Sequence, residues 1–253
     1  MVDEHTTQKR EAASSFDESA SAYLNSDVHR AGDDLERLAS WCDGATRALD
    51  VATGAGHTAG AIADHGVDEV VATDAAPGMI ETATTEFDVA GVVADAERLP
   101  FDADVFDAVS CRIAAHHFPN PSALVEEVAR ITADGGVFAL EDNVAPPATE
   151  LDEFLNEVER LRDPTHVRSA TEAEWVEWVT DAGFDIEHRR LIKKEINYED
   201  WVSQLDTPEQ ARERLRELFA DPPDGAESLF EITHEDGNLV SFSNLKVLVR
   251  ARR

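Results

Sequence analysis

Cysteine, lysine and long apolar runs are scarce in this sequence, and each scarcity excludes a class of protein. Two cysteines, Cys42 and Cys111, are too few for a disulfide framework or a four-thiolate metal site, so we expect both to be buried as apolar thiols. No apolar run approaches the roughly 20 residues of a membrane span, and the N-terminal segment is not an apolar leader. We therefore expect a soluble, cytoplasmic protein without a membrane partner.

Basic residues are few in general. The chain has 22 Lys and Arg, four of them lysine, against 53 Asp and Glu, and its formal net charge is −31. A surface this acidic repels itself at low salt and is a feature that halophiles use, so we expect a source organism adapted to high salt. The charge also opposes phosphate backbones, which makes nucleic acid a poor candidate partner, although salt near 1 M shortens this repulsion to roughly 3 Å.

Short apolar runs alternate with alanine-rich amphipathic stretches from residue 46 onward. This alternation predicts βαβ units, and therefore an α/β fold with a parallel sheet. The expected strands are 48–52, 69–73, 91–94, 106–111, 137–141, 184–193 and 239–250.

Helical stretches lie before and between the later strands. With 253 residues and 42% hydrophobic residues, the chain suits one large domain with a real core. We expect a single domain over 1–253, with its core in 34–142, 184–193 and 236–253. Its helical lid would come from 1–33, 143–183 and 194–235.

A glycine-containing turn follows the first expected strand. Gly54 and Gly56 allow a ligand to approach the backbone there, because no Cβ intervenes. With Ala59 they also match the loose dinucleotide-binding pattern. A turn that serves only to tighten a crossover between strand and helix can contain the same residues. Asp74 ends the second strand twenty residues after Gly54, where a carboxylate can accept hydrogen bonds from ribose hydroxyls.

Polar residues also end the next two strands. Asp95 follows the third strand, where a short carboxylate can bind the exocyclic amine of an adenine. Arg112, His116 and His117 end or follow the fourth strand. Because ligands of open α/β sheets bind outside the carboxyl ends of the strands, we expect these residues on one rim.

With these motifs, the chain resembles the class I S-adenosylmethionine (SAM)-dependent methyltransferases. It is most similar to the ubiquinone/menaquinone-biosynthesis C-methyltransferase branch and its uncharacterised bacterial relatives. The segments that match in order and spacing are 49–56, 71–79, 92–101, 107–118 and 124–142, and 16–23 resembles the family's N-terminal lead-in. The resemblance implies a Rossmann-like fold. Its seven-stranded, mostly parallel sheet would have the order 3-2-1-4-5-7-6, with the last strand antiparallel and helices on both faces.

The resemblance also implies a site for SAM, with S-adenosylhomocysteine (SAH) as product. Asp50 would lie near the methionine ammonium, Asp74 would bind the ribose, and Asp95 with Ala96 would read the adenine edge. Arg112 would lie under the sulfonium, and Tyr23 would close over the cofactor. The expected cofactor-binding residues are Tyr23, Asp50, Thr53, Gly54, Ala55, Gly56, Asp74, Ala75, Met79, Asp95, Ala96 and Arg112.

Transfer of an activated methyl group asks little of side chains beyond alignment and exclusion of water. A base helps when the acceptor is a hydroxyl or an activated carbon. His116 and His117 are the candidates, although two histidines that cap a loop would look the same. Arg162 and His166 are candidate contacts to an anionic or phenolate acceptor, or else solvated charges at a helix end. No metal site is expected, because no further ligand pair has a useful spacing.

We therefore expect SAM-dependent methyl transfer to a small organic acceptor, by a monomer or homodimer, with O-, C- and N-methylation all open. A nicotinamide-dependent oxidoreductase is an alternative, which the absence of a Tyr-x-x-x-Lys motif disfavours. A non-catalytic regulatory module that retains the cofactor pocket is another. A methyltransferase acting on RNA or protein is a third, and it lacks the support of a basic groove.

Overall fold

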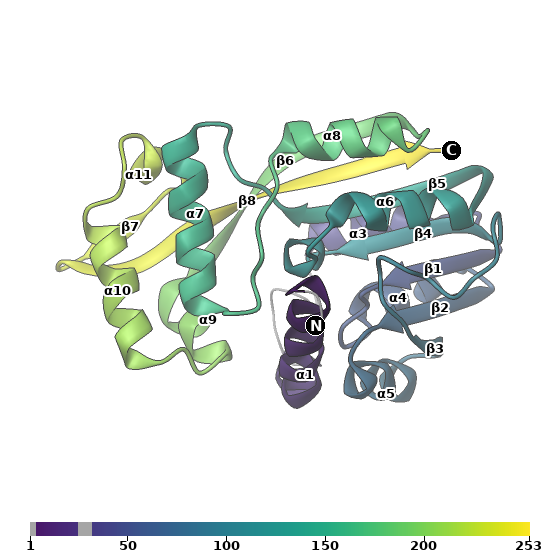
Figure 1. Ribbon diagram of the computed structural model, residues 1–253, viewed down its shortest axis with the longest axis horizontal. Helices are drawn as coiled ribbons and strands as arrows, with labels where there is room; N and C mark the ends of the chain where they lie inside the picture. The colour runs from purple at the N-terminus through teal and green to yellow at the C-terminus, as the bar shows by residue number, and fades with distance from the viewer. Residues whose placement is uncertain (1–3, 25–31) are drawn as a thin grey trace.

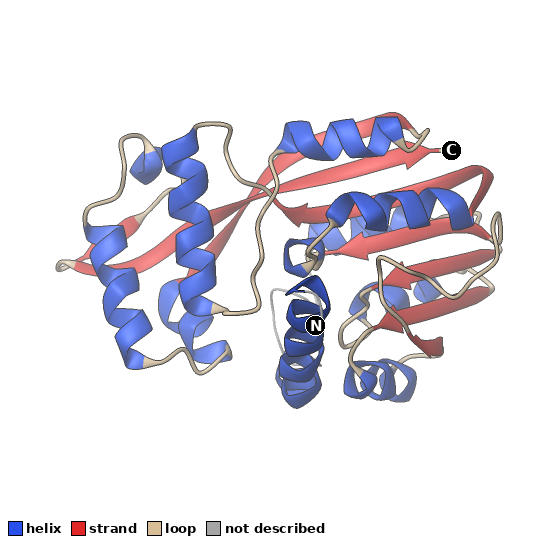
Figure 2. Cartoon of the chain, viewed as in Figure 1, coloured by secondary structure: helices blue, strands red, loops and turns tan. Residues whose placement is uncertain are grey.

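A mixed sheet with helices on both faces forms the centre of the molecule (Figures 1 and 2). The structure, a computed structural model, describes residues 4–24 and 32–253, without the side chains of Glu4 and residues 18–23. The strands are β1 (Arg47–Val51), β2 (Glu69–Asp74), β3 (Ala90–Val93), β4 (Phe106–Arg112), β5 (Thr132–Asn143), β6 (Asp185–Asn197), β7 (Thr233–Glu235) and β8 (Asn238–Arg252).

The strand order confirms the fold class expected from the sequence. The main path is β3-β2-β1-β4-β5-β8-β6, and β8 runs antiparallel to both β5 and β6. The structure adds an eighth strand, β7, which pairs only with β8 and which we had expected to be helical. All three of its residues are exposed, so it has no apolar alternation that a sequence pattern could reveal.

Helices cover both faces of the sheet and extend beyond it. They are α1 (Glu4–Leu24), α3 (Asp33–Ser40), α4 (His57–Asp64), α5 (Pro77–Glu86), the 3-10 helix η1 (Ala115–His117), α6 (Pro121–Ile131), α7 (Thr149–Arg162), α8 (Glu172–Asp181), α9 (Tyr198–Gln204), α10 (Glu209–Ala220) and α11 (Ala226–Leu229). Helices α3, α4 and α5 pack on one face, and α6 and α8 pack on the other (Figure 1).

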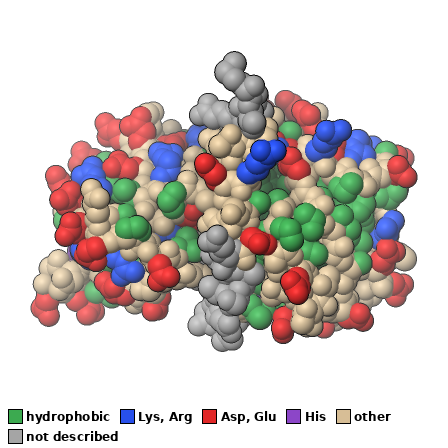
Figure 3. Space-filling model, turned by 60° about the horizontal axis from the view of Figure 1, so that its bottom comes forward, with side chains coloured by type: hydrophobic (Ala, Val, Ile, Leu, Met, Phe, Trp, Pro, Cys, Tyr) green, Lys and Arg blue, Asp and Glu red, His purple; other side chains and the backbone are tan. Residues whose placement is uncertain are grey.

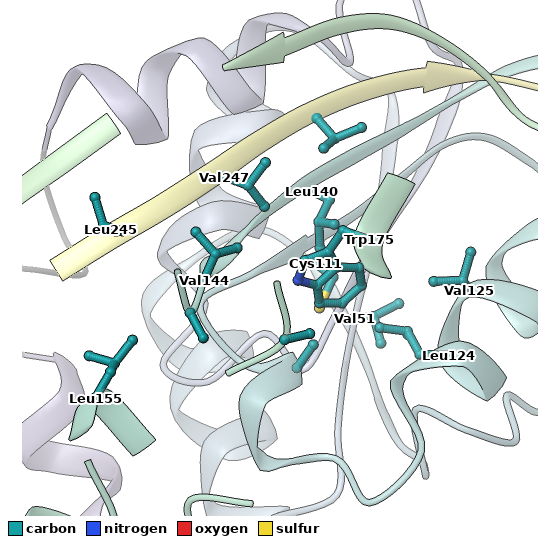
Figure 4. Close-up of a cluster of buried hydrophobic side chains, with 14 of the residues drawn as sticks. Val51, Cys111, Leu124, Val125, Leu140, Val144, Leu155, Trp175, Leu245 and Val247 are labelled. Atoms are coloured by element: carbon teal, nitrogen blue, oxygen red, sulfur yellow. The ribbon is translucent and has the colours of Figure 1, made fainter. Parts of the chain in front are cut away.

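Residues 143–183 divide between two places, although we expected all of them in the lid. Helix α8 packs on α6 and β6, and Trp175, only 1% exposed, lies in the main apolar cluster with Cys111 and Leu140 (Figure 4). Helix α7 instead packs with α10 beside α9, where β6 and β8 extend past the rest of the sheet (Figure 1). The long strands therefore carry one continuous core from the Rossmann-like half into a helical half.

Both cysteines are buried, as expected, and burial raises the pKa of Cys42 to about 12. Acidic side chains are spread over the face shown in Figure 3, and lysines and arginines are interspersed among them. Within the described residues, no helix has the length and apolar character to cross a membrane.

Candidate active site

A cavity of about 700 Å³ opens at the carboxyl ends of β1, β2 and β4. Helix α1 lies along one side of it, and α7 and α9 contribute to the opposite side. The expected site residues that line it are Thr53, Gly54, Ala55, Asp74, Ala75, Met79, Asp95, Ala96, Arg112, His116, His117 and Arg162. Asp50, Gly56 and His166 lie behind its wall, and the side chain of Tyr23 falls outside the described part of the chain.

Asp50 supports the glycine-containing turn from below. Its two carboxylate oxygens accept hydrogen bonds from the hydroxyls of Thr53, at 2.7 Å, and Ser110, at 2.6 Å. Burial raises its pKa to about 6, and the hydrogen bonds from Ser110 and Thr53 oppose that rise. Asp50 is 1% exposed and does not line the cavity, so in this structure it holds the turn through Thr53, and its expected place near the methionine ammonium stays a prediction.

The two glycines of the turn do different things. Gly54, with φ +55°, lines the cavity, and a Cβ on it would meet no atom within 4 Å. Gly56, with φ +94°, faces α5, and a Cβ on it would lie 2.7 Å from the Cβ of Ala83. Gly54 thus leaves the backbone open to a ligand, whereas Gly56 lets α4 and α5 pack closely.

Asp74 links the turn to the start of α5. Its carboxylate accepts the backbone N–H of Gly54 at 3.0 Å and that of Ala76 at 2.9 Å. Burial raises its pKa, and these backbone hydrogen bonds oppose the rise. A carboxylate has about four acceptor positions, so Asp74 retains capacity for ligand hydroxyls at the cavity wall.

Lys9 of α1 binds the acidic residues that follow β3. Its Nζ lies 2.8 Å from Asp95 Oδ2 and 2.6 Å from Glu97 Oε2. The expected adenine edge of the site is therefore also an anchor for α1.

Arg112 belongs to a buried ion network. Its Nε donates to Glu141 at 2.8 Å, and its terminal nitrogen donates to Asp34 of α3 at 2.9 Å. Lys194 of β6 also binds Asp34, at 3.0 Å. Burial acts to raise the pKa of Asp34, but the hydrogen bond and charge of Arg112 hold it well below its usual value.

His116 forms a hydrogen-bonded pair with Asp142 at the cavity wall. Its Nδ1 lies 2.6 Å from Asp142 Oδ1, and both side chains are buried. The same carboxylate oxygen accepts the backbone N–H of Asn143, so it is an acceptor and Nδ1 is the donor. This leaves Nε2 of His116 able to accept a proton.

His117 and His166 lie near His116, with ring centroids 4.3 Å and 5.5 Å from its ring and their planes tilted against it by 45° and 34°. His117 binds Thr165 at 3.1 Å, and burial lowers its pKa to about 4. His166 binds Asn156 at 2.9 Å, and burial lowers its pKa to about 2. Both are therefore neutral near pH 7.

Arg162 and several residues that the sequence did not indicate complete the second half of the cavity. Arg162 donates to the backbone oxygen of Trp201 at 3.2 Å and to Gln204 at 3.0 Å. The added residues that line the cavity include Asn143, Glu159, Lys194, Trp201, Asn244 and Lys246. The scarcity of lysine was a usable signal, because three of the four lysines line this cavity. No group of metal-ligating side chains is found among the described residues.

Residues 49–140 match a family model described as a methyltransferase domain. The uncharacterized methyltransferase YcgJ of Bacillus subtilis (strain 168) is 34% identical over 244 residues, which cover 93% of this chain and 96% of that protein. The chain is a class I methyltransferase.

Solved structures agree with this assignment. The crystal structure of YcgJ matches the methyltransferase with a TM-score of 0.83 at 33% identity, covering 87% of this chain and 97% of that one. BH2331 of Bacillus halodurans C-125 also gives a TM-score of 0.83, at 36% identity, covering 87% and 99%.

The similarity to quinone-modifying enzymes is more local. Demethylmenaquinone methyltransferase of Beutenbergia cavernae is 37% identical to this methyltransferase over 102 residues, which cover 40% of this chain and 42% of that protein. The family resemblance inferred from the motifs is confirmed, and the nicotinamide-dependent oxidoreductase is set aside.

Proposed function

We propose that this methyltransferase uses SAM and transfers its methyl group to a small organic acceptor in the 700 Å³ cavity. One observation carries the proposal. The same cavity is lined by the glycine-containing turn with Asp74 in one part and, in another, by His116, which Asp142 holds from behind, with residues of α7 and α9. Such a cavity can hold two small molecules against each other and away from water.

The residues of the first half are suited to SAM. Gly54 leaves space where a Cβ would stand, and Asp74 has free acceptor positions for ribose hydroxyls. Met79, 1% exposed, and Ala96 supply apolar contact for an adenine ring, with the Asp95 carboxylate beside them. SAM would supply an electrophilic methyl group at this place.

His116 is the base that we propose for acceptors that lose a proton. Asp142 fixes the ring and holds the proton on Nδ1, so Nε2 is the atom that takes the proton from the acceptor. His117 is the weaker candidate, because its Nδ1 binds the neutral hydroxyl of Thr165 and not a carboxylate, and burial favours its neutral form over the charged form that a base must adopt.

Titration calorimetry with SAM, SAH and NADH tests the cofactor. We expect micromolar binding of SAM and SAH, no binding of NADH, and at least tenfold weaker SAH binding by Asp74→Ala. Asp107→Ala is the matched control, because Asp107 binds the backbone N–H groups of Thr46 and Arg47 away from the cavity. Binding of NADH in place of SAH would overturn the proposal.

Methyl transfer from radiolabelled SAM to a metabolite panel tests catalysis and separates an enzyme from a regulatory module. With an acceptor in hand, Asp142→Asn should lower kcat by about 100-fold, because the amide no longer holds the proton on Nδ1. Its SAH affinity should stay that of the wild type. An unchanged kcat would remove His116 from the mechanism.

A further inference from the structure

Four polar side chains form a patch on β5, β8 and β6 at the second half of the cavity. Asn143 of β5 is paired with Lys246 of β8, and Lys194 of β6 is paired with Asn244 of β8. Lys246 and Asn244 are two residues apart in one strand, so they lie on the same face of the sheet. We call Asn143, Lys246, Asn244 and Lys194 the polar ladder, and all four line the cavity.

Lys246 is the buried cation of the polar ladder. It is 2% exposed, and its Nζ donates one hydrogen bond, to Asn143 Oδ1 at 2.7 Å. Within the described residues it forms no ion pair, which is unusual for a buried lysine. An ammonium has three donors, so two remain for a ligand in the cavity.

Asn244 is also incompletely satisfied. It is 4% exposed, and its Nδ2 donates to Glu159 Oε1 of α7 at 2.7 Å. Its Oδ1 has no hydrogen-bond partner among the described residues. Buried polar atoms are normally paired, so this open acceptor beside Lys246 indicates that a ligand there also carries a hydrogen-bond donor, such as a hydroxyl.

The charge of this wall differs from that of the molecule. Arg162 also lines it, and its hydrogen bonds go to a backbone oxygen and to Gln204, both neutral acceptors. Glu159 is the carboxylate of this part of the cavity lining, and it accepts from Asn244, whereas the whole chain carries a net charge of −31. Two cations that form no described ion pair thus lie in the cavity of a strongly acidic protein.

Lys246 lies near buried carboxylates with which it forms no described ion pair. Burial lowers its pKa, and the nearby Glu141 opposes that decrease. Glu141 already binds Arg112, however, and it does not reach Lys246 as an ion-pair partner within the described network. A ligand anion would therefore complete the surroundings of Lys246 that the protein leaves open.

We propose that the methyl acceptor is an organic anion, and that Lys246 of the polar ladder binds its negatively charged oxygen group through the two N–H donors that the protein leaves open. This inference rests on the proposed function, because it assigns the second half of the same cavity. Carboxylates and phenolates share the required chemistry, so the test includes one pair of probes for each.

The experiment measures binding to the full chain at saturating SAH. Para-hydroxybenzoate is compared with para-hydroxybenzamide, and para-nitrophenolate with para-nitroanisole, so that each anion has a neutral partner of similar shape. We expect at least one anion to bind about tenfold or more tightly than its neutral partner. We expect Lys246→Met to remove that preference without changing SAH affinity. Lys193→Met is the matched control, since Lys193 pairs with Glu231 outside the cavity.

The outcomes separate this inference from the proposed function. If the wild type does not bind SAH, the proposed function fails. If SAH binds but neither anion is preferred, the anionic acceptor is wrong, and this comparison needs no variant to fold. Retention of the full preference by a folded Lys246→Met protein would also overturn the assignment to Lys246.

Discussion

At the scale of single residues, the site depends on groups that never reach the cavity. Asp50 holds Thr53 and Ser110, Asp142 orients His116, and Gly56 allows α4 to lie against α5. Each acts through a neighbour, so its loss changes stability or alignment before it changes contact with a ligand. Two predictions concern such residues.

Gly56→Ala should destabilise the protein by about 2 kcal/mol or more, because it adds strain at φ +94° to an overlap with Ala83. Gly66→Ala is the matched control. Gly66 has φ +87°, but a Cβ there would meet nothing within 4 Å, so the expected cost is about 1 kcal/mol. Urea unfolding measures both, and equal losses would show that the contact with α5 contributes nothing.

His166 should make stability depend on pH. Its pKa falls from 6.5 to about 2 on folding, so the unfolded chain binds a proton that the folded chain does not. Stability should therefore decrease as pH falls below 6.5, with a share from His166 of about 2 kcal/mol between pH 7 and pH 5.

In His166→Gln this share should disappear, whereas the exposed His234→Gln control should keep the wild-type dependence. Parallel curves for the three proteins would contradict the buried, neutral state of His166.

At the scale of elements, the helices differ in how firmly they are attached. Helix α8 begins with a capping box, in which Thr171 and Glu174 satisfy each other's backbone N–H groups, and it buries Trp175. Helix α1 buries little and depends on Lys9 and on contacts with α5. Helix α8 therefore belongs to the core, whereas we expect α1 to detach from the rest of the protein at a lower free-energy cost.

Thr171→Ala should lower the free energy of unfolding by about 1 kcal/mol, since it removes the cap of α8. Thr180→Ala, at an exposed site in the same helix, should change it by less than about 0.5 kcal/mol. A thermal melt of each variant measures the difference, and equal melting temperatures would argue against the cap.

Lys9→Met should speed amide hydrogen exchange in α1 by roughly threefold to sixfold, because it removes the two ion pairs to Asp95 and Glu97. The exposed Arg10→Met control should leave exchange in α1 unchanged. Mass spectrometry resolves α1 from β1, whose exchange should be the same in all three proteins. If exchange in α1 responds to neither change, other contacts hold the helix.

The sequence predicted the elements whose signals are local and missed those that depend on distant partners. The buried runs of β1, β2 and β4 and the polar residues at their ends were visible, because strand and rim lie side by side in the chain. The pairing of Arg112 with Asp34 spans 78 residues and that of Lys194 with Asp34 spans 160, so no spacing could indicate either. The packing of α8 on the sheet through Trp175 was expected from the i, i+3 spacing of Trp175 and Trp178, although the helix was also assigned to the lid.

At the scale of the whole molecule, charge dominates. A net charge of −31 at low ionic strength gives a repulsion that folding must overcome, and salt screens it. We propose on this basis that the protein is adapted to high salt.

The melting temperature should rise by on the order of 10 °C between 0.1 M and 2 M KCl, followed by circular dichroism. Sucrose of equal osmolality is the control for general exclusion effects and should stabilise less. A melting temperature that is flat or falls with KCl would contradict the adaptation.

The length of β8 affects how ligands enter and leave the cavity. This strand pairs with β5 in the Rossmann-like half and continues, unbroken, between β6 and β7 in the helical half. Because one strand pairs in both halves, we expect the sheet to oppose a hinge motion between them. Helix α1 lines the cavity from outside this sheet, so we expect the residence time of a ligand to depend on how firmly α1 is held.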